Sequence, residues 1–382
     1  MVKEFAFINF FRAIAAFWVV SAHCMIWGNW YGAITNPKIA VDLFMIISGY
    51  LMAANAYTRN QFEPLNTWRN WLRFYLRRYF RLAPAYYLFL ALAIVFSNYF
   101  LKGYHELEIQ SGKWVYGGIY DPTRIQYTLE NIMLHISFLF GLHPTYSFST
   151  FLPDWSLSLE MQFYFIFPAL LLSMQKFGFT KTAFGIGLSA FIIGLGIQKV
   201  AHYYEPSLLI MKLNYFIAGI LLFRVFITNT PKYKQLRLTL CAFFLVSIDY
   251  RYGKELLVLP LLLLAMFTLG WLEKTNKTPK WIFALINCRL TRFASDSSYG
   301  VYLFHGFFIS ASGLIIAKNN ELIKLLAYQR VFLMFLFVTT MAYFTAWLVY
   351  RLIELPGIAL GKYFIKRVAP IQTTQNVREL SV

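Results

Sequence analysis

Charged residues are scarce in this sequence, and so are cysteines. Aspartate, glutamate, lysine and arginine make up 14% of the 382 residues, whereas a soluble protein carries about a quarter. Hydrophobic residues make up 59% and are grouped in runs of membrane-span length. The three cysteines, Cys24, Cys241 and Cys288, lie in or beside such runs, so neither a disulfide framework nor a thiolate metal site is indicated. The composition predicts an all-α, polytopic membrane protein.

Several signatures of soluble enzymes are missing as well. The sequence has no Walker-type loop, no G-x-S-x-G elbow and no His/Asp/Glu set with metal-ligand spacing, so we expect no metal. The formal net charge is nevertheless +18. In a membrane protein, basic cytosolic loops and contact with anionic lipid head groups account for such a charge, so we expect no nucleic-acid partner.

Ten apolar runs predict transmembrane helices. The run at 238–250 is the shortest of them, and the apolar segment 129–142 is too short and too interrupted, so we expect it to be interfacial or re-entrant. With both termini cytosolic, 22 lysines and arginines lie inside and ten outside, as the positive-inside rule requires. The runs lie at about 7–27, 39–57, 82–100, 155–175, 182–198, 208–227, 238–250, 255–272, 299–317 and 331–350.

The first run carries two ionisable residues, Arg12 and His23, which are rare inside a membrane without a purpose. Eleven residues are close to three helical turns, so both side chains should lie on one face, about 16 Å apart along the axis. Arg12 interrupts the apolar stretch and no cleavage pattern follows, so we expect the N-terminus to be retained rather than removed as a signal peptide.

The predicted topology gives each polar residue a depth. His23, Asp42 and Glu160 fall toward the outer side, whereas Arg12 and His305 fall toward the cytosol. A neutral imidazole is the usual general base near pH 7, and Asp42 or Glu160 would orient His23 and stabilise its imidazolium. The alternative is a histidine that only hydrogen-bonds a neighbouring helix.

A second candidate is an arginine cluster just before the third run. Its arginines lie at helical spacings, with aromatic residues between them, and no lysine occurs among them. Guanidinium groups bind phosphate bidentately and aromatic rings can stack on a base, so the cluster suits a nucleotide or polyphosphate. The alternative is a loop that contacts lipid head groups. The arginines are Arg69, Arg73, Arg77, Arg78 and Arg81.

A third candidate is a polar stripe at the start of the ninth run. Tyr299, Tyr302 and His305 follow one another at intervals of three residues, which places them on one helix face. An interfacial aromatic belt would explain Tyr299 well but His305 poorly.

Together these blocks resemble the membrane-bound acyltransferase-3 family. An arginine followed after ten residues by histidine is similar to its opening signature, and Val41-Asp42-Leu43-Phe44 to its second span. Arg78-x-x-Arg81 is similar to the family's basic motif, and Trp155-Ser156-Leu157 with Glu160 to its fourth span. Ser298-Tyr299 with Tyr302 and His305 is similar to its ninth span. One departure is Asn9, which stands where the family often has an aspartate, so an ion pair there is absent.

The resemblance implies a ten-helix O-acyltransferase that moves an acyl group, usually acetyl from acetyl-CoA, to a hydroxyl of a surface or lipid-linked carbohydrate. It implies that His23 and Arg12 are essential and that Arg78 and Arg81 hold the donor, and we add Arg73, Arg77, Tyr302 and His305 as donor-binding candidates. His23 would act by direct proton removal or as an acyl carrier, and sequence does not separate the two routes.

Two rivals from other classes stay open at this point. A transporter or flippase of a lipid-linked saccharide would use the intramembrane charges as a substrate path, although no internal repeat relates the two halves. A structural or sensory protein would leave the arginine cluster unexplained. We expect one transmembrane domain over 1–370 in a bacterial inner membrane, surrounded by lipid, and a disordered polar tail over 371–382.

Overall fold

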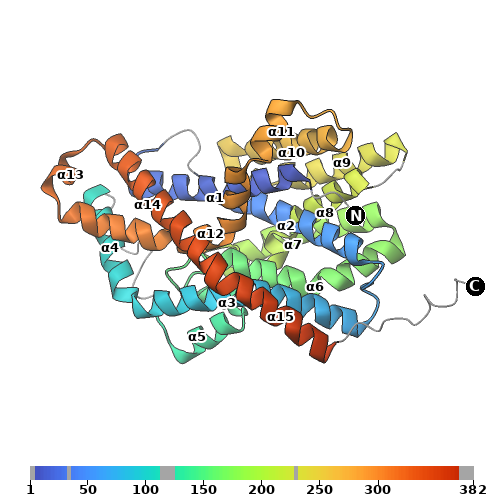
Figure 1. The fold of residues 1–382 in the computed structure, drawn as a ribbon, viewed down its shortest axis with the longest axis horizontal. Helices are drawn as coiled ribbons and strands as arrows, with labels where there is room; N and C mark the ends of the chain where they lie inside the picture. Colours follow the sequence, from blue (N-terminus) through green and yellow to red (C-terminus); the bar gives the residue numbers. More distant parts are fainter. Residues whose placement is uncertain (1–4, 32–35, 112–124, 228–230, 370–382) are drawn as a thin grey trace, which may run out of the picture.

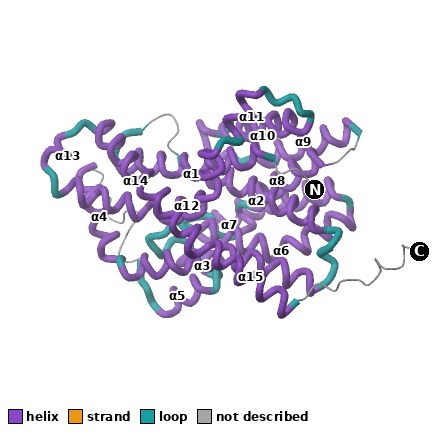
Figure 2. Tube along the Cα trace, viewed as in Figure 1, coloured by secondary structure: helices purple, strands orange, loops and turns teal. Residues whose placement is uncertain are grey.

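The computed structural model describes residues 5–31, 36–111, 125–227 and 231–369, and among these it contains helices, turns and loops but no strand (Figure 1, Figure 2). The predicted tail at 371–382 lies outside the described residues. The helices are α1 (Ala6–Trp27), α2 (Pro37–Arg59), α3 (Trp68–Val95), α4 (Ser97–Ser111), α5 (Leu129–Ile136), α6 (Trp155–Phe177), α7 (Phe179–Ala201), α8 (Leu213–Ile227), α9 (Lys232–Ser247), α10 (Val258–Lys274), α11 (Lys280–Ile286), α12 (Arg289–Ala317), α13 (Asn320–Lys324), α14 (Ala327–Val349) and α15 (Leu355–Val368).

The all-helical membrane bundle predicted from composition is confirmed. Seven helical stretches of the described chain are long and apolar enough to cross a membrane. Each of the ten predicted runs lies largely on a helix. Three of them, at 208–227, 238–250 and 255–272, correspond to the shorter helices α8, α9 and α10, which have 15, 16 and 17 residues. The count of ten spans and the cytosolic side of both termini stay predictions.

The segment 129–142 does not form a helix of span length. Its helix α5 has eight residues, and a 3₁₀ turn at Phe140–Leu142 follows it. Eight residues of α-helix measure about 12 Å, far less than the bilayer core of about 30 Å. The expectation that this segment does not cross the membrane therefore agrees with the structure.

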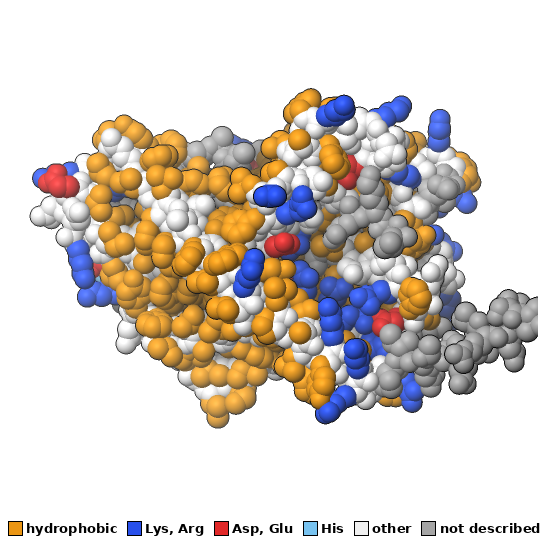
Figure 3. All heavy atoms as spheres, in the orientation of Figure 1, with side chains coloured by type: hydrophobic (Ala, Val, Ile, Leu, Met, Phe, Trp, Pro, Cys, Tyr) orange, Lys and Arg blue, Asp and Glu red, His pale blue; other side chains and the backbone are white. Residues whose placement is uncertain are grey.

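Three of the helices that carry predicted functional residues meet in the middle of the molecule. Figure 1 shows α1, α2 and α12 there, with α4 and α13 toward one end and α6 and α9 toward the other. Most lysines and arginines of the face in Figure 3 gather on its right half, whereas its left half is mainly hydrophobic. On this face, the two ends of the bundle therefore differ in charge.

Helices α2 and α8 touch through their backbones at two glycines. A Cβ atom at Gly49 would overlap the carbonyl oxygen of Phe216, and one at Gly219 would overlap that of Ile46. Small residues allow such close approach, which gains van der Waals contact where lipid offers no hydrophobic driving force between helices. This contact sets the position of α2, whose side chains line the cavity described below.

The glycine contact gives a stability prediction. Gly49→Ala should lower the free energy of unfolding by about 1–3 kcal/mol, because backbone rather than a flexible side chain has to move. Gly185→Ala on α7 is the matched control, since no heavy atom lies within 4 Å of its Cβ position, and it should be neutral or stabilising by up to about 1 kcal/mol. Denaturant unfolding in detergent measures both, and equal effects would contradict the prediction.

Candidate active site

A cavity of about 290 Å³ lies between α1, α2, α3, α6 and α12. Aliphatic and aromatic side chains form most of its wall, and convergent polar groups interrupt it. Pockets of this kind are typical of small-molecule sites. The polar groups include Arg12, Ser48, Arg78, Arg81, Glu160 and Tyr302, so five of the ten residues predicted for the site line one cavity.

Three of these cavity residues are arginines. Arg12 donates from Nη2 to Ser298 Oγ over 3.1 Å, which ties α1 to α12. Arg78 lies over the rings of Phe74 and Tyr164, 5.6 and 5.7 Å from their centroids, and its buried Nε has no partner. In the described part of the chain, no carboxylate forms an ion pair with Arg12, Arg78 or Arg81. The cavity therefore presents cationic groups to an anionic ligand.

The other two predicted donor arginines do not face this cavity, which corrects that part of the prediction. Arg73 donates to the carbonyl oxygen of Ala369 over 2.6 Å and to Asn70 Oδ1 over 2.7 Å. Arg77 lies 2.6 Å from Glu63 Oε2. Helical spacing placed these arginines on α3 correctly, but their partners come from distant segments that periodicity does not reveal.

Glu160 lies in the cavity wall but does not orient His23. Its Oε1 accepts hydrogen bonds from Ser48 Oγ at 2.9 Å and from the hydroxyl of Tyr164 at 2.5 Å. Because the Tyr164 ring faces the Arg78 guanidinium, the carboxylate fixes one side of the arginine site. In the structure, Glu160 therefore holds the tyrosine ring that packs against Arg78.

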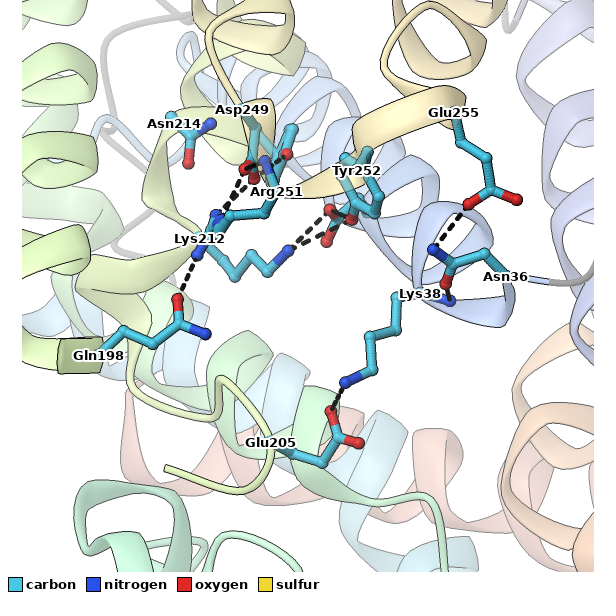
Figure 4. Close-up of polar contacts among 12 residues, drawn as sticks. Asn36, Lys38, Gln198, Glu205, Lys212, Asn214, Asp249, Arg251, Tyr252 and Glu255 are labelled. Atoms are coloured by element: carbon cyan, nitrogen blue, oxygen red, sulfur yellow. Dashed lines mark hydrogen bonds and ion pairs between the residues drawn. The ribbon is translucent and has the colours of Figure 1, made fainter. Parts of the chain in front are cut away.

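Asp42 does not orient His23 either, and it lies outside the cavity. Its Oδ2 accepts from Lys212 Nζ over 2.8 Å and from the hydroxyl of Tyr252. Figure 4 shows the labelled Lys212 extending toward Tyr252, next to a second set of polar contacts between Asp249 and Arg251. The predicted role of Asp42 as a partner of the His23 imidazole is therefore wrong, because its carboxylate is paired with Lys212, which lies 170 positions away in the chain.

Loss of this buried pair should be costly. Asp42 and Lys212 are 0% and 4% exposed, so Lys212→Met should lower the free energy of unfolding by about 3–5 kcal/mol by leaving a buried charge unpaired. The double variant Asp42→Leu/Lys212→Met should recover most of that loss. Denaturant unfolding of both variants in detergent tests this, and a double variant that is no more stable than the single one would contradict it.

His23 and His305 form a pair. His305 Nε2 lies 3.2 Å from His23 Nδ1, and the ring centroids are 4.9 Å apart. The prediction that His305 lies toward the cytosolic side, away from His23, is therefore wrong. The reason is that α12 begins at Arg289, ten residues before the apolar run, so His305 lies well inside a 29-residue helix. His305 is a partner of His23 and does not line the cavity.

Tyr302 lies between the cavity and the imidazole pair. Its hydroxyl accepts a hydrogen bond from Ser156 Oγ over 2.9 Å, and its ring centroid lies 6.4 Å from that of His305. Of the pair on α1, only Arg12 lines the cavity, whereas His23 lies beyond it. The structure thus places Arg12 in the cavity and the imidazole pair outside it, farther along α1 and α12.

The fold and this site define a class, namely a multi-pass membrane protein with an arginine-lined cavity inside its helical bundle. Comparison with known proteins narrows the class. A family model described as "Acyltransferase domain" matches residues 5–351. The chain belongs to this membrane-bound acyltransferase-3 family, as the resemblance implied.

Several curated relatives agree with that family. A putative membrane-bound transacylase, BcsY, of Komagataeibacter xylinus is 31% identical over 157 residues, which cover 38% of this chain and 34% of that protein. The peptidoglycan O-acetyltransferase OatA of Listeria monocytogenes is 29% identical over 198 residues, 50% of this chain and 27% of that protein. The O-acetyltransferase OatA of Staphylococcus aureus is 28% identical over 199 residues, 50% of this chain and 29% of that protein. The matches span about a third of these relatives or less. No solved structure matches.

Proposed function

We propose that this protein is an O-acyltransferase of a bacterial inner membrane, which takes acetyl from acetyl-CoA and transfers it to a hydroxyl of a surface or lipid-linked carbohydrate. The family supports acyl transfer. Two relatives, O-acetyltransferases of which one acts on peptidoglycan, support a carbohydrate acceptor.

The observation that carries the proposal is the cavity with three arginines, none of which forms an ion pair with a carboxylate of the described residues. Acetyl-CoA presents phosphates at one end and a thioester at the other. Arg78 and Arg81 would bind the phosphates, since guanidinium groups match phosphate geometry. Arg12 would steer the pantetheine arm or stabilise the oxyanion that forms at the thioester carbonyl.

His23 would then carry the chemistry by one of two routes. In direct attack, it takes the proton of the acceptor hydroxyl, the oxygen bonds to the acyl carbon, and the thioester C–S bond breaks. The CoA thiolate leaves and receives the proton. In the relay, the imidazole nitrogen attacks first, CoA leaves as the thiol, and the acceptor hydroxyl then takes the acyl group from the acyl-imidazole.

The geometry favours a separation of donor and acceptor. Arg12 and His23 lie eleven residues apart on α1, which corresponds to about 16 Å. A donor held at the arginines would have to extend its thioester past Tyr302 to reach His23. The saccharide would meet the thioester there from the outer side, and acyl transfer would cross the membrane without the passage of CoA.

The proposal is tested with purified protein in proteoliposomes. Acetyl-CoA labelled in the acetyl group is supplied on the arginine side, and a saccharide acceptor on the other. We expect donor binding, slow thioester hydrolysis without acceptor, and label in the saccharide with acceptor. Saccharide that crosses the bilayer while the thioester stays intact would refute the proposal and favour the transporter. A trapped acetyl-His23 would identify the relay, and a ternary-complex rate law would identify direct attack.

A further inference from the structure

The hydrogen bonds of the imidazole pair specify which nitrogen of each ring carries the hydrogen. His23 Nδ1 lies 2.9 Å from the carbonyl oxygen of Val19, and His305 Nδ1 lies 2.8 Å from that of Tyr302. A carbonyl oxygen can only accept, so each neutral ring must carry its hydrogen on Nδ1. Both Nε2 atoms then hold lone pairs.

The contact between the rings follows from this assignment. His305 Nε2 lies 3.2 Å from His23 Nδ1, so the Nδ1–H group of His23 has two acceptors, Val19 O and His305 Nε2. The Nε2 atom of His23 has no hydrogen bond with any described residue and is the one basic nitrogen of the pair that stays open. In the ring of His305, by contrast, both nitrogens are engaged.

The partner of His23 Nδ1 in this pair is the neutral ring of His305 and not a charged side chain. Among the described residues, no carboxylate lies at ion-pair distance from His23 or His305. Arg12 on the same helix is about 16 Å away by helical rise, and the hydroxyl of Tyr302 is hydrogen-bonded to Ser156. A neutral imidazole therefore occupies the place that a carboxylate takes in many catalytic triads.

We propose that His305 is a positioning residue for His23, a step that rests on the proposed function. It accepts from His23 Nδ1–H, fixes the plane of that ring, and directs Nε2 of His23 toward the acceptor hydroxyl. When Nε2 takes the hydroxyl proton, the Nδ1–H group becomes a stronger donor and its bond to His305 stabilises the imidazolium. The acceptor oxygen then bonds to the acyl carbon, the C–S bond breaks, and Nε2 returns the proton to the departing thiolate.

Two substitutions separate the hydrogen bond from the shape of the ring. His305→Phe keeps a ring but removes the acceptor, whereas His305→Gln can place an amide oxygen near the position of Nε2. We expect His305→Phe to lower kcat about 10- to 100-fold with donor Kd unchanged, and His305→Gln to stay within about tenfold of the wild type. Unchanged donor binding also shows that each variant is folded.

A spectroscopic measurement on the wild type does not depend on either variant. In protein labelled with ¹⁵N-histidine, protonated and unprotonated ring nitrogens have well separated chemical shifts, and His23→Ala and His305→Gln assign the signals. We expect protonated Nδ1 and unprotonated Nε2 in both rings. A protonated Nε2 on His305, or a His305→Phe variant as fast as the wild type, would overturn the inference. If the wild type transfers no acyl group, the proposed function fails, and the ¹⁵N spectrum still decides the hydrogen bond.

Discussion

His23→Ala should lower kcat for acyl transfer by about a thousandfold or more, because general-base catalysis alone contributes about 10²–10⁴-fold. Donor binding should stay unchanged, since His23 does not line the cavity that holds the arginines. Equilibrium binding of acetyl-CoA and transfer of labelled acetyl to the saccharide, measured on the same preparation, separate the two effects. In the relay route the acetylated form of the protein should also disappear.

The matched control for this variant is His143→Ala, which removes an exposed histidine in the connection between α5 and α6. It should bind donor and transfer acetyl like the wild type. A His23→Ala variant that retains transfer within tenfold of the control would exclude His23 as the chemical residue. Loss of donor binding in His23→Ala would instead show that the donor reaches beyond Tyr302 and contacts the His23 imidazole in the ground state.

Arg78→Gln and Arg81→Gln should each weaken the binding of acetyl-CoA about tenfold to a hundredfold, because a hydrogen bond to a charged group contributes about 1.5–3 kcal/mol. The loss should nearly vanish for acetyl-pantetheine, which lacks the phosphates of the nucleotide. Binding of both donors to both variants, at low and moderate salt, measures this effect. Raised salt should weaken wild-type binding more than that of either variant.

Arg292→Gln serves as the control for charge alone. Arg292 is exposed in the first turn of α12 and donates to the backbone oxygen of Asn287, so this variant lowers the net charge by the same amount without touching the cavity. Equal losses for Arg78→Gln and Arg292→Gln would show that bulk positive charge holds the donor. Equal losses for acetyl-CoA and acetyl-pantetheine would exclude the phosphates as the ligands of Arg78.

The sequence predicted which segments are helical because the apolar runs that a bilayer requires are long and clear. It predicted the arginines of the cavity only in part. Periodicity puts Arg73, Arg77 and Arg81 on one helix, but it does not show that the carbonyl of Ala369 and the carboxylate of Glu63 take two of them. Such pairings join segments far apart in the chain.

The same limit explains the partners of Asp42 and His23. Lys212 stands inside the predicted run at 208–227, and a buried lysine needs a carboxylate, so that residue was an available signal for the Asp42 pair. His305 was misplaced because depth was counted from the start of the apolar run, whereas the helix itself begins at a cap on Cys288. Helix ends made of polar residues are where apolar patterns carry least information.

The separation of Arg12 from His23 on one uninterrupted helix limits which insertions and deletions the protein can tolerate. Inserting one codon between them would turn His23 by about 100° about the axis of α1 relative to Arg12. The His23 ring would then lose its contact with His305. That residue could not follow, because its helix α12 is held to α1 by the hydrogen bond from Arg12 to Ser298. Insertions and deletions should therefore be excluded from the eleven-residue interval, while the connection at 275–279 between α10 and α11 should tolerate changes in length.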